Sequence, residues 1–502
     1  MQQSGQHPVD RKTISIISLL SLFAFLVQGF HPYAEDGGLY VAGIKKVLDP
    51  SLYRTRPEFV LAPMRFSPFA LVVADIARIF HLSLPWLLLL LYVSSIWATL
   101  FGGWMVISRC SASLAARCGA VGLLACWLGI PIAGTSLMLM DPYLTARSFS
   151  TPLTLFAIAW AMDARAGGRR AWILCALALT LATVHPLMAG FAFGAVGLAL
   201  VADSKRTNIR RWGPVGLGAC ALGIAAILQA IAAHESAQYL AAAMTRTYWF
   251  PLQWQWYEWF GLLAPIALLF ALGHAAQSSG GRTLSQMAIT LGTISLVVAL
   301  VFSRTELATH LVARLQPLRS FQIVYEVMIL LLGAWLAEHW LGKKAWRWGL
   351  LMIMLGGIMF GAQRSTYPAS AHVEWPGMAT KNQWAQAFRW IREHTPKDAL
   401  FALDAHYITR EGEDAQSFRG IAERSVLADY SKDGGETSIA PSLAEAWAEG
   451  QTAQTRLDEE SDSERIAALK PARVGWVVLA KDSVTAWECP YENASVKVCR
   501  IP

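Results

Sequence analysis

Apolar residues occur in this 502-residue chain as runs of helical length, separated by short polar loops. Eleven such runs fill most of the first 364 residues: 13–30, 84–107, 119–138, 150–163, 171–184, 186–201, 214–233, 259–275, 284–302, 319–338 and 349–363. A helix needs about twenty apolar residues to cross the hydrocarbon core of a bilayer. The pattern therefore predicts eleven membrane crossings, three of them from runs well short of that length.

The segment 66–80 (FSPFALVVADIARIF) is also apolar, but it is short and carries Asp75 and Arg78. We predict that it lies at the membrane surface, because counting it as a crossing would reverse the side of every later loop. The first outer loop then extends over 31–83. Within it, residues 39–48 have the pattern of an amphipathic helix that lies in the interface.

From about residue 365 the pattern becomes that of a soluble domain. Residues 380–394 (TKNQWAQAFRWIREH) predict a helix that ends before Pro396. The stretches ALFAL at 399–403 and RVGWVVLA at 473–480 predict strands. The tail therefore reads as an α/β domain.

The composition is typical of an integral membrane protein. Apolar residues make up 55% and charged residues 15%, and mean hydropathy is +0.38, whereas soluble domains are roughly a quarter charged. The 21 Trp fit the same class, because Trp gathers where a bilayer meets water. We predict a mainly α fold, with a polytopic transmembrane helical bundle over 1–364 and an extracytoplasmic α/β domain over 365–502.

The net charge of +7 is the sum of two unlike parts. The first 364 residues hold 27 Lys and Arg against 14 Asp and Glu, and the remainder holds 15 against 21. Fifteen cations fall in short loops on one side of the predicted path, at 11–12, 109–117, 165–170, 205–211, 282 and 343–347. Since basic loops face the cytoplasm, we expect a membrane protein with a cytoplasmic N-terminus and the tail outside. The cations set topology, so no nucleic-acid partner is expected.

Cysteine usage fits this placement. Five cysteines lie in or beside the predicted spans, where they can pack as small apolar residues. Cys489 and Cys499 stand alone in the tail, in two β-like pieces separated by a turn. This spacing favours a disulfide-clamped hairpin in an oxidising compartment; the alternative is two free thiols.

The first outer loop begins with HPYAEDGG, in which Glu35 and Asp36 are adjacent carboxylates just beyond the first span. Carboxylates at a lipid–water boundary can act as a general base or bind a divalent cation. The alternative is a solvated turn that ends the helix.

Two later positions carry further candidates. In MDPYLTARSFSTP, Asp141 ends one span and Arg147 precedes the next; an arginine there can hold a phosphate, or anchor the helix at the interface. His185 and Pro186 interrupt the apolar run from 171 to 201. Broken helices at membrane depth are tolerated where they line a wet cavity or meet protein, although a structural turn is the simpler reading.

Two more outer segments remain ambiguous. The aromatic stretch 245–260 is either an interfacial belt or a platform for sugars and lipid. The segment 303–320, with Arg314 and Arg319, can hold an anionic head group or form a salt-bridged surface. Glu326 is a carboxylate deep in a predicted span. Placing an ionisable side chain inside a membrane costs free energy, so Glu326 is a functional candidate.

Several enzyme classes lack a motif here. No Walker loop, no G-x-S-x-G and no H-E-x-x-H occurs in the sequence. A transporter or lipid flippase, with His185 and Glu326 on one path, stays open as an alternative. A non-catalytic envelope protein whose tail binds partners is a third possibility.

The layout and its motifs resemble the GT-C superfamily, integral-membrane glycosyltransferases that use polyprenyl-phosphate sugars. HPYAEDGG looks like the family's first-loop acidic motif, and Asp141 with Arg147 looks like a later outer-loop site of several branches. The tail phrase WIREHTPKDALF is similar to one that bacterial members carry after their last span. The resemblance implies inverting transfer of a sugar from a polyprenyl-phosphate donor to an unknown acceptor.

The resemblance also implies the roles of single residues. Asp36, or Glu35, corresponds to the catalytic carboxylate. The donor and its phosphate would be held by the following residues: Arg147, Arg65, Arg314, Asp141 and His185. A divalent cation remains an open question, since no second acidic motif of the D-x-D kind is present. We expect the two carboxylates to converge with Asp141 and Arg147 at an apolar lateral opening.

Overall fold

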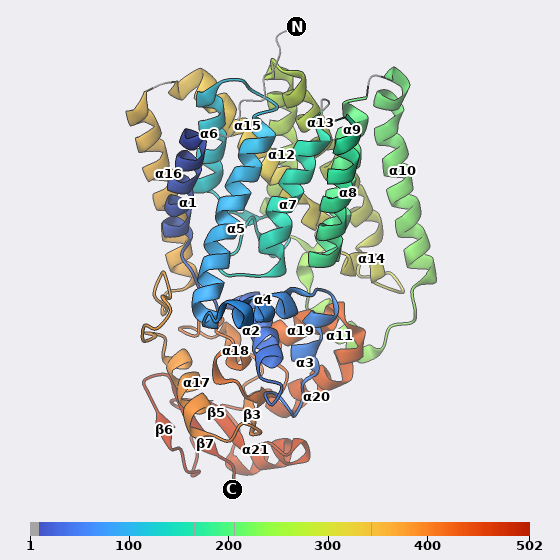
Figure 1. The fold of residues 1–502 in the computed structure, drawn as a ribbon. Helices are drawn as coiled ribbons and strands as arrows, with labels where there is room; N and C mark the ends of the chain where they lie inside the picture. The colour runs from blue at the N-terminus through green and yellow to red at the C-terminus, as the bar shows by residue number, and fades with distance from the viewer. Residues whose placement is uncertain (1–9, 164–166, 205, 343) are drawn as a thin grey trace.

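The computed structural model describes residues 10–163, 167–204, 206–342 and 344–502. Arg165, Lys205 and Lys343, which were counted among the topology cations, lie outside these ranges. Within the ranges, a helix occupies each of the eleven predicted apolar segments, and together they form the bundle in the upper part of Figure 1. The helices are α1 (Arg11–Gln28), α5 (Leu84–Ile107), α6 (Leu114–Cys126), α7 (Ala146–Ala161), α8 (Gly167–Val184), α9 (Pro186–Ala202), α10 (Thr207–Ile231), α12 (Trp256–Ala275), α13 (Ser279–Phe302), α15 (Phe321–Leu336) and α16 (Ala345–Thr366).

Seven helical stretches of the described chain are long and apolar enough to cross a membrane, judged by length and composition. The number rises to eight if the bent pair formed by 58–65 and α4 (Phe69–Phe80) is one broken span. α6 and α9 are apolar but shorter. A polytopic helical membrane domain is therefore present, and the total of eleven crossings stays a prediction.

The predicted span 119–138 is wrong in its second half. α6 ends at Cys126, and β1 (Pro131–Ile132) then pairs antiparallel with β2 (Leu137–Met138). Pro131 has no N–H to donate, and Gly134 turns the chain with a φ of +67°, a conformation that suits glycine. A Cβ at this position would lie 2.2 Å from the Trp254 ring. The hairpin leads the chain into the loop that carries Asp141.

Two amphipathic helices lie across the end of the bundle (Figure 1). α2 (Glu35–Leu48) contains the predicted interfacial stretch, and it packs against α4. α4 bends by 95° from the preceding segment, which holds α3 (Glu58–Leu61) and a 3-10 turn. In Figure 1 α4 runs across the bundle rather than along it, and its place at the membrane surface stays a prediction.

The C-terminal domain is α/β, as the sequence predicted. A five-stranded sheet has the order β4-β3-β5-β7-β6, with β3 parallel to β4 and β5 and with β7 antiparallel to β5 and β6. The strands are β3 (Leu400–Leu403), β4 (Ser425–Val426), β5 (Trp476–Ala480), β6 (Tyr491–Glu492) and β7 (Val496–Arg500). The helices are α17 (Gln383–His394), α18 (Phe418–Ala422), α19 (Lys432–Ile439), α20 (Ala444–Gln454) and α21 (Asp462–Leu469). The predicted domain boundary, 364/365, falls in the last turn of α16.

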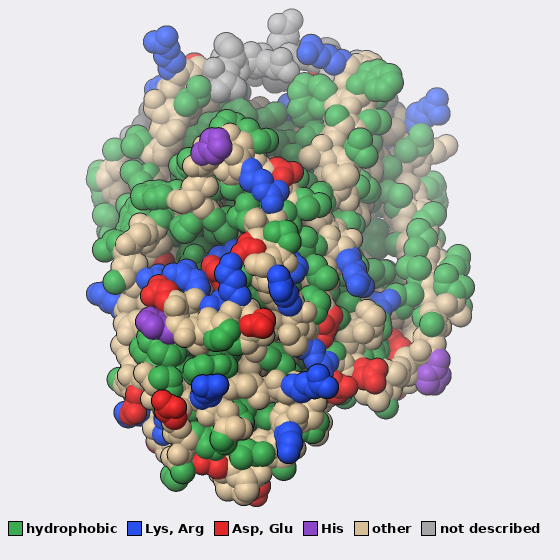
Figure 2. All heavy atoms as spheres, turned by 60° about the horizontal axis from the view of Figure 1, so that its bottom comes forward, with side chains coloured by type: hydrophobic (Ala, Val, Ile, Leu, Met, Phe, Trp, Pro, Cys, Tyr) green, Lys and Arg blue, Asp and Glu red, His purple; other side chains and the backbone are tan. Residues whose placement is uncertain are grey.

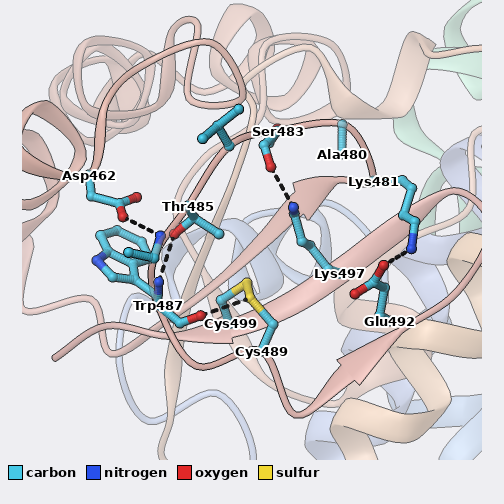
Figure 3. The surroundings of a disulfide bond; sticks show 12 residues. Asp462, Ala480, Lys481, Ser483, Thr485, Trp487, Cys489, Glu492, Lys497 and Cys499 are labelled. Carbon is cyan, nitrogen blue, oxygen red and sulfur yellow. Dashed lines mark hydrogen bonds and ion pairs between the residues drawn. A yellow bond between two sulfur atoms is a disulfide. The ribbon is translucent and has the colours of Figure 1, made fainter.

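The predicted disulfide is confirmed: Cys489 is bonded to Cys499 (Figure 3). The bond closes the β6–β7 hairpin, in which Tyr491 stands opposite Val498. Cys499 is fully buried in the hydrophobic cluster on one face of the sheet. The hairpin is therefore fastened both by pairing and by a covalent link.

The first outer loop joins the two parts of the molecule. Ala34 forms an antiparallel bridge with Gln416, and Phe30 forms a parallel bridge with Val373. Lys45 of α2 donates to the Gly420 carbonyl at 2.8 Å, so α2 is held on α18. In Figure 2 charged side chains gather over the C-terminal domain, whereas hydrophobic side chains dominate the flanks of the bundle. The domain interface is thus built around the start of α2.

Candidate functional site

A cavity of about 1680 Å³ lies where the helical bundle meets the C-terminal domain. One end is charged and is formed by the start of α2, the loop before α7 and the first turns of α19. The other end is apolar and extends between α9, α10 and α13. All seven residues predicted to form the site line this cavity: Glu35, Asp36, Arg65, Asp141, Arg147, His185 and Arg314.

The glycines of the EDGG motif allow the acidic pair to sit where it does. A Cβ on Gly37 would lie 2.9 Å from Cβ of Tyr143, and one on Gly38 would lie 2.1 Å from Cβ of Ser417. Only glycine permits the start of α2 to be wedged this closely between the two parts of the molecule. Glu35 itself has a φ of +51°, which is uncommon for a residue with a side chain. Such strained residues cluster at functional sites.

The acidic pair has a partner that sequence reasoning missed. The Lys432 ammonium, from the start of α19, forms ion pairs with Glu35 and with Asp36, the latter at 3.3 Å. It reaches the carboxylates from the opposite domain, across 396 positions of sequence. The charged end of the cavity is therefore shared between the domains.

These contacts shift the pKa values of the charged groups. Burial alone would raise the pKa of Asp36, but Lys432, Arg147 and Arg319 outweigh it and lower the pKa. For Lys432, burial is outweighed by the two carboxylates, which raise its pKa. Asp36 is thus ionised, and Lys432 is charged, at neutral pH.

Glu436 lies one turn after Lys432 on the same face of α19 and lines the same cavity. Burial, reinforced by the charges of Asp36 and Asp433, raises the pKa of Glu436 to about 8. A carboxyl group with this pKa holds its proton at neutral pH. It can therefore donate a hydrogen bond where Asp36 can only accept one.

This assignment predicts how stability depends on pH. Glu436→Gln should raise the thermal unfolding temperature by a few degrees at pH 8.5 and leave it unchanged at about pH 4. The folded-state pKa of about 8 lies above the ordinary value of 4.5, so wild type is fully stabilised below pH 4.5 and loses that stability as pH rises from there to about 8. The measurement is thermal unfolding in detergent. Glu445→Gln, at an exposed carboxylate on α20, is the control, and a difference independent of pH would contradict the assignment.

Asp141 and Arg147 form a buried ion pair, as their spacing allowed. Asp141 lies in the loop after β2, and Arg147 lies in the first turn of α7. The Nε of Arg147 has no hydrogen-bond partner among the described residues, and the same holds for Nε of Arg319. Both side chains line the cavity. Buried polar groups are normally satisfied, so these atoms indicate a polar ligand.

The apolar end of the cavity is a groove between three helices. α10 contributes one face of small and aliphatic side chains, and α9 contributes both aliphatic side chains and two glycines, Gly190 and Gly194. No atom lies within 4 Å of the Cβ position on Gly190, and only Leu291, at 3.6 Å, approaches that of Gly194. The aliphatic lining consists of Leu187, Leu198, Leu217, Ala221, Ile224, Leu228, Leu291, Ile294 and Val298. The groove therefore suits a long hydrocarbon chain.

The remaining predicted residues lie nearer the edges. Arg65 is exposed and Arg314 is partly exposed. His185 is the N-cap of α9, where its Nδ1 accepts the Met188 N–H at 3.5 Å. Its role as a helix cap is thus visible, and it also faces the cavity. Glu326 is buried in α15 outside the cavity, so the path that a transporter would need through His185 and Glu326 is not formed by this cavity.

The acidic pair is also the place where the sequence allows a divalent cation. Within the described ranges, no group of three or more His, Cys, Asp or Glu side chains is close enough to hold a metal ion. The adjacent carboxylates Glu35 and Asp36 are paired with Lys432. The two carboxylates that could bind a cation are therefore already in contact with a charged side chain of the protein.

The comparisons with known proteins concern both parts of the chain. The family model described as domain of unknown function (DUF6798) matches residues 382–448, a stretch that contains Lys432 and Glu436. No curated protein matches the sequence. Among solved structures, the chain is similar to the Archaeoglobus fulgidus oligosaccharyltransferase in complex with Zn and sulfate, at 13% identity and a TM-score of 0.44, over 93% of this chain and 68% of that one. For the apo form of the same protein the identity is 12% and the TM-score 0.48, over 93% and 69% of the two chains.

Proposed function

We propose that this chain is an integral-membrane glycosyltransferase that moves a sugar from a polyprenyl-phosphate donor to an acceptor hydroxyl. The observation that carries the proposal is the division of one cavity into a charged end at the domain interface and an apolar groove between α9, α10 and α13. A lipid-linked sugar has the same division, with a hydrocarbon tail, an anionic phosphate and a polar sugar.

Two guanidinium N–H groups without a partner support a position for the phosphate of the lipid-linked sugar. Arg147 and Arg319 each have an Nε without a hydrogen-bond partner among the described residues. Charge-assisted hydrogen bonds from arginine suit phosphate oxygens. The phosphate would lie between these two guanidinium groups, with Thr145 beside it and the tail in the groove. Arg65 and Arg314 would add positive charge at the edge, and Asp141 would orient Arg147.

The acidic pair supplies the base. Asp36 accepts the proton of the acceptor hydroxyl, whose oxygen forms a bond to the anomeric carbon from the side opposite the phosphate. The bond from this carbon to the phosphate oxygen breaks, and its electron pair leaves with the polyprenyl phosphate. The configuration at the anomeric carbon is inverted. Arg147 and Arg319 stabilise the charge that develops on the departing phosphate.

Two features support an orientation of the chain in the membrane: the basic loops and the disulfide bond. The predicted basic loops and the C-terminal domain lie at opposite ends of the bundle (Figure 1). Basic loops favour the cytoplasm, and the Cys489–Cys499 bond favours an oxidising compartment. We propose a bacterial inner-membrane enzyme whose N-terminus is cytoplasmic and whose C-terminal domain and cavity face the periplasm. We propose that it belongs to a bacterial branch of GT-C-type enzymes.

The groove can be tested separately from the charged end. Gly190→Leu should lower the specificity constant for the lipid donor about 10- to 100-fold, because overpacking an apolar site costs about 1–3 kcal/mol. Gly190 lines the groove on α9, and a Cβ at this position would meet no atom within 4 Å. Gly223→Leu is the control: it adds the same side chain on α10 at an exposed position outside the cavity lining. Equal effects of the two variants would show that the groove holds no donor.

The function itself is tested by the lipids of a deletion strain. Extracts should contain a polyprenyl-phosphate sugar at several times its level in the parent, and mass spectrometry would identify the sugar. The wild-type gene should return the lipid to its normal level. The Asp36→Asn gene, expressed to the same amount, should not. An unchanged profile of lipid-linked sugars in the deletion strain would contradict the proposal.

A further inference from the structure

Lys432 stands where a cation would have to stand to bridge the acidic pair. Its ammonium contacts both Glu35 and Asp36, and its side chain is 19% exposed. An ammonium group is a compact point charge with three donors, and it can serve two carboxylates at once. A divalent metal at the same place would be repelled by the positive charge of the ammonium.

The turn that presents Lys432 is fastened from its own domain. Asp429 accepts the Lys432 backbone N–H at 2.6 Å. Asp433 accepts two hydrogen bonds from the Arg419 guanidinium, at 2.7 and 2.9 Å. Both Arg419 and Asp433 are buried. The start of α19 is therefore rigidly placed on the domain.

The same turn is also gripped by the membrane part. Arg246 donates to the carbonyls of Ser431, at 2.9 Å, and Tyr430, at 3.2 Å. Gly434 makes room for this guanidinium, since a Cβ there would lie 3.1 Å from a terminal nitrogen of Arg246. Arg246 follows α11 (Ala237–Met244), which packs against α19. Lys432 is therefore held at the cavity by contacts from both sides of the interface.

We infer that Lys432 is the built-in cation of the acidic pair: it replaces a divalent metal and makes the C-terminal domain part of the catalytic site. The inference rests on the proposed function for its consequence, which is that sugar transfer proceeds without an added metal. Lys432 acts through Glu35 and Asp36 and is in this sense a positioning residue. Its ion pairs with both carboxylates hold them at the charged end of the cavity.

The first experiment needs no substrate. Binding of Mn²⁺ alone to the purified full-length protein in detergent is measured by electron paramagnetic resonance up to millimolar metal. Wild type and Lys432→Arg should show no binding that depends on the acidic pair. Lys432→Ala should gain one Mn²⁺ per chain, and Glu35→Gln with Asp36→Asn added to it should abolish that gain. Unfolding temperatures check that each variant is folded.

Two outcomes of this experiment overturn the inference. In the first, wild type binds Mn²⁺ through the acidic pair as tightly as Lys432→Ala does. In the second, the folded Lys432→Ala protein gains no metal. The Lys432→Arg protein and wild type keep the test decisive if Lys432→Ala fails to fold, because pair-dependent Mn²⁺ binding by either one contradicts a resident cation.

The second experiment joins the inference to catalysis. Transfer by wild type should be unchanged by a chelator, and transfer by Lys432→Ala should fall at least tenfold and be partly restored by Mn²⁺. Loss of wild-type transfer in the chelator would overturn the inference while leaving the glycosyltransferase function standing. Absence of transfer by every variant, with the Mn²⁺ gain still present, would overturn the function and leave Lys432 as the cation of the pair.

Discussion

Replacing Asp36 by Asn and Glu35 by Gln together should lower the rate of sugar transfer by about 10²- to 10⁴-fold, the usual contribution of a general base. Both replacements keep a hydrogen-bond acceptor beside Lys432, so the change removes proton-accepting ability with little change of shape. The measurement is transfer from the lipid-linked sugar that accumulates in the deletion strain, with purified protein in detergent. Binding of that lipid should be much less affected than turnover.

The single replacements divide the roles of the two carboxylates. If Asp36 is the base, Asp36→Asn should account for most of the loss, and Glu35→Gln should act mainly through the position of Lys432. Asp49→Asn is the matched control, because Asp49 is the C-cap of the same helix and pairs with Lys397 away from the cavity. Wild-type rates for both single replacements would show that the assignment of the base is wrong.

The parts of the site that could be predicted from sequence are those that are local along the chain. Glu35 and Asp36 are adjacent, and Asp141 and Arg147 are six residues apart across a helix start, so residue type and spacing indicated each pair. Each pair was then found on the same cavity. Lys432 could not be found in this way, because its contact with Asp36 spans 396 positions and depends on how the domains dock.

One signal in the sequence does point to the docked turn. The tripeptide Asp-Gly-Gly occurs at 36–38 and again at 433–435, each time at a helix start preceded by a charged residue. In both places the glycines allow a distant segment of the same chain to approach closely: Ser417 lies against Gly38, and Arg246 lies against Gly434. The repetition reflects the packing demands of one interface. It becomes informative only once the two turns are known to meet.

The fold shows the same division between local and non-local information. Apolar runs predicted the helices, and the alternating pieces around Cys489 and Cys499 predicted the clamped hairpin. The error in 119–138 arose because hydrophobicity alone does not distinguish a buried hairpin from a helix. The run does contain Pro131 and Gly134, two residues that favour a turn over a helix, and the observed hairpin is built around them. The packing of α2 on α18 had no local signal, because it depends on residues from both domains.

Arg319→Gln should weaken use of the lipid donor by about 10- to 100-fold in kcat/KM, mainly through KM, without lowering the stability of the protein. A hydrogen bond to a charged group contributes about 1.5–3 kcal/mol, and each 1.4 kcal/mol is about tenfold. Arg319 contacts no carboxylate directly among the described residues, and its Nε has no partner there. Its replacement therefore removes a ligand contact and no ion pair.

Arg147→Gln is the informative comparison, because Arg147 faces the same cavity but is also paired with buried Asp141. It should lower kcat/KM by a similar factor and in addition destabilise the protein by about 3–5 kcal/mol, the cost of leaving one member of a buried pair alone. Adding Asp141→Asn should recover much of the stability without recovering donor use. Titration with the polyprenyl phosphate, together with unfolding in denaturant, separates the two effects. Undiminished donor binding in both arginine variants would show that the phosphate lies elsewhere.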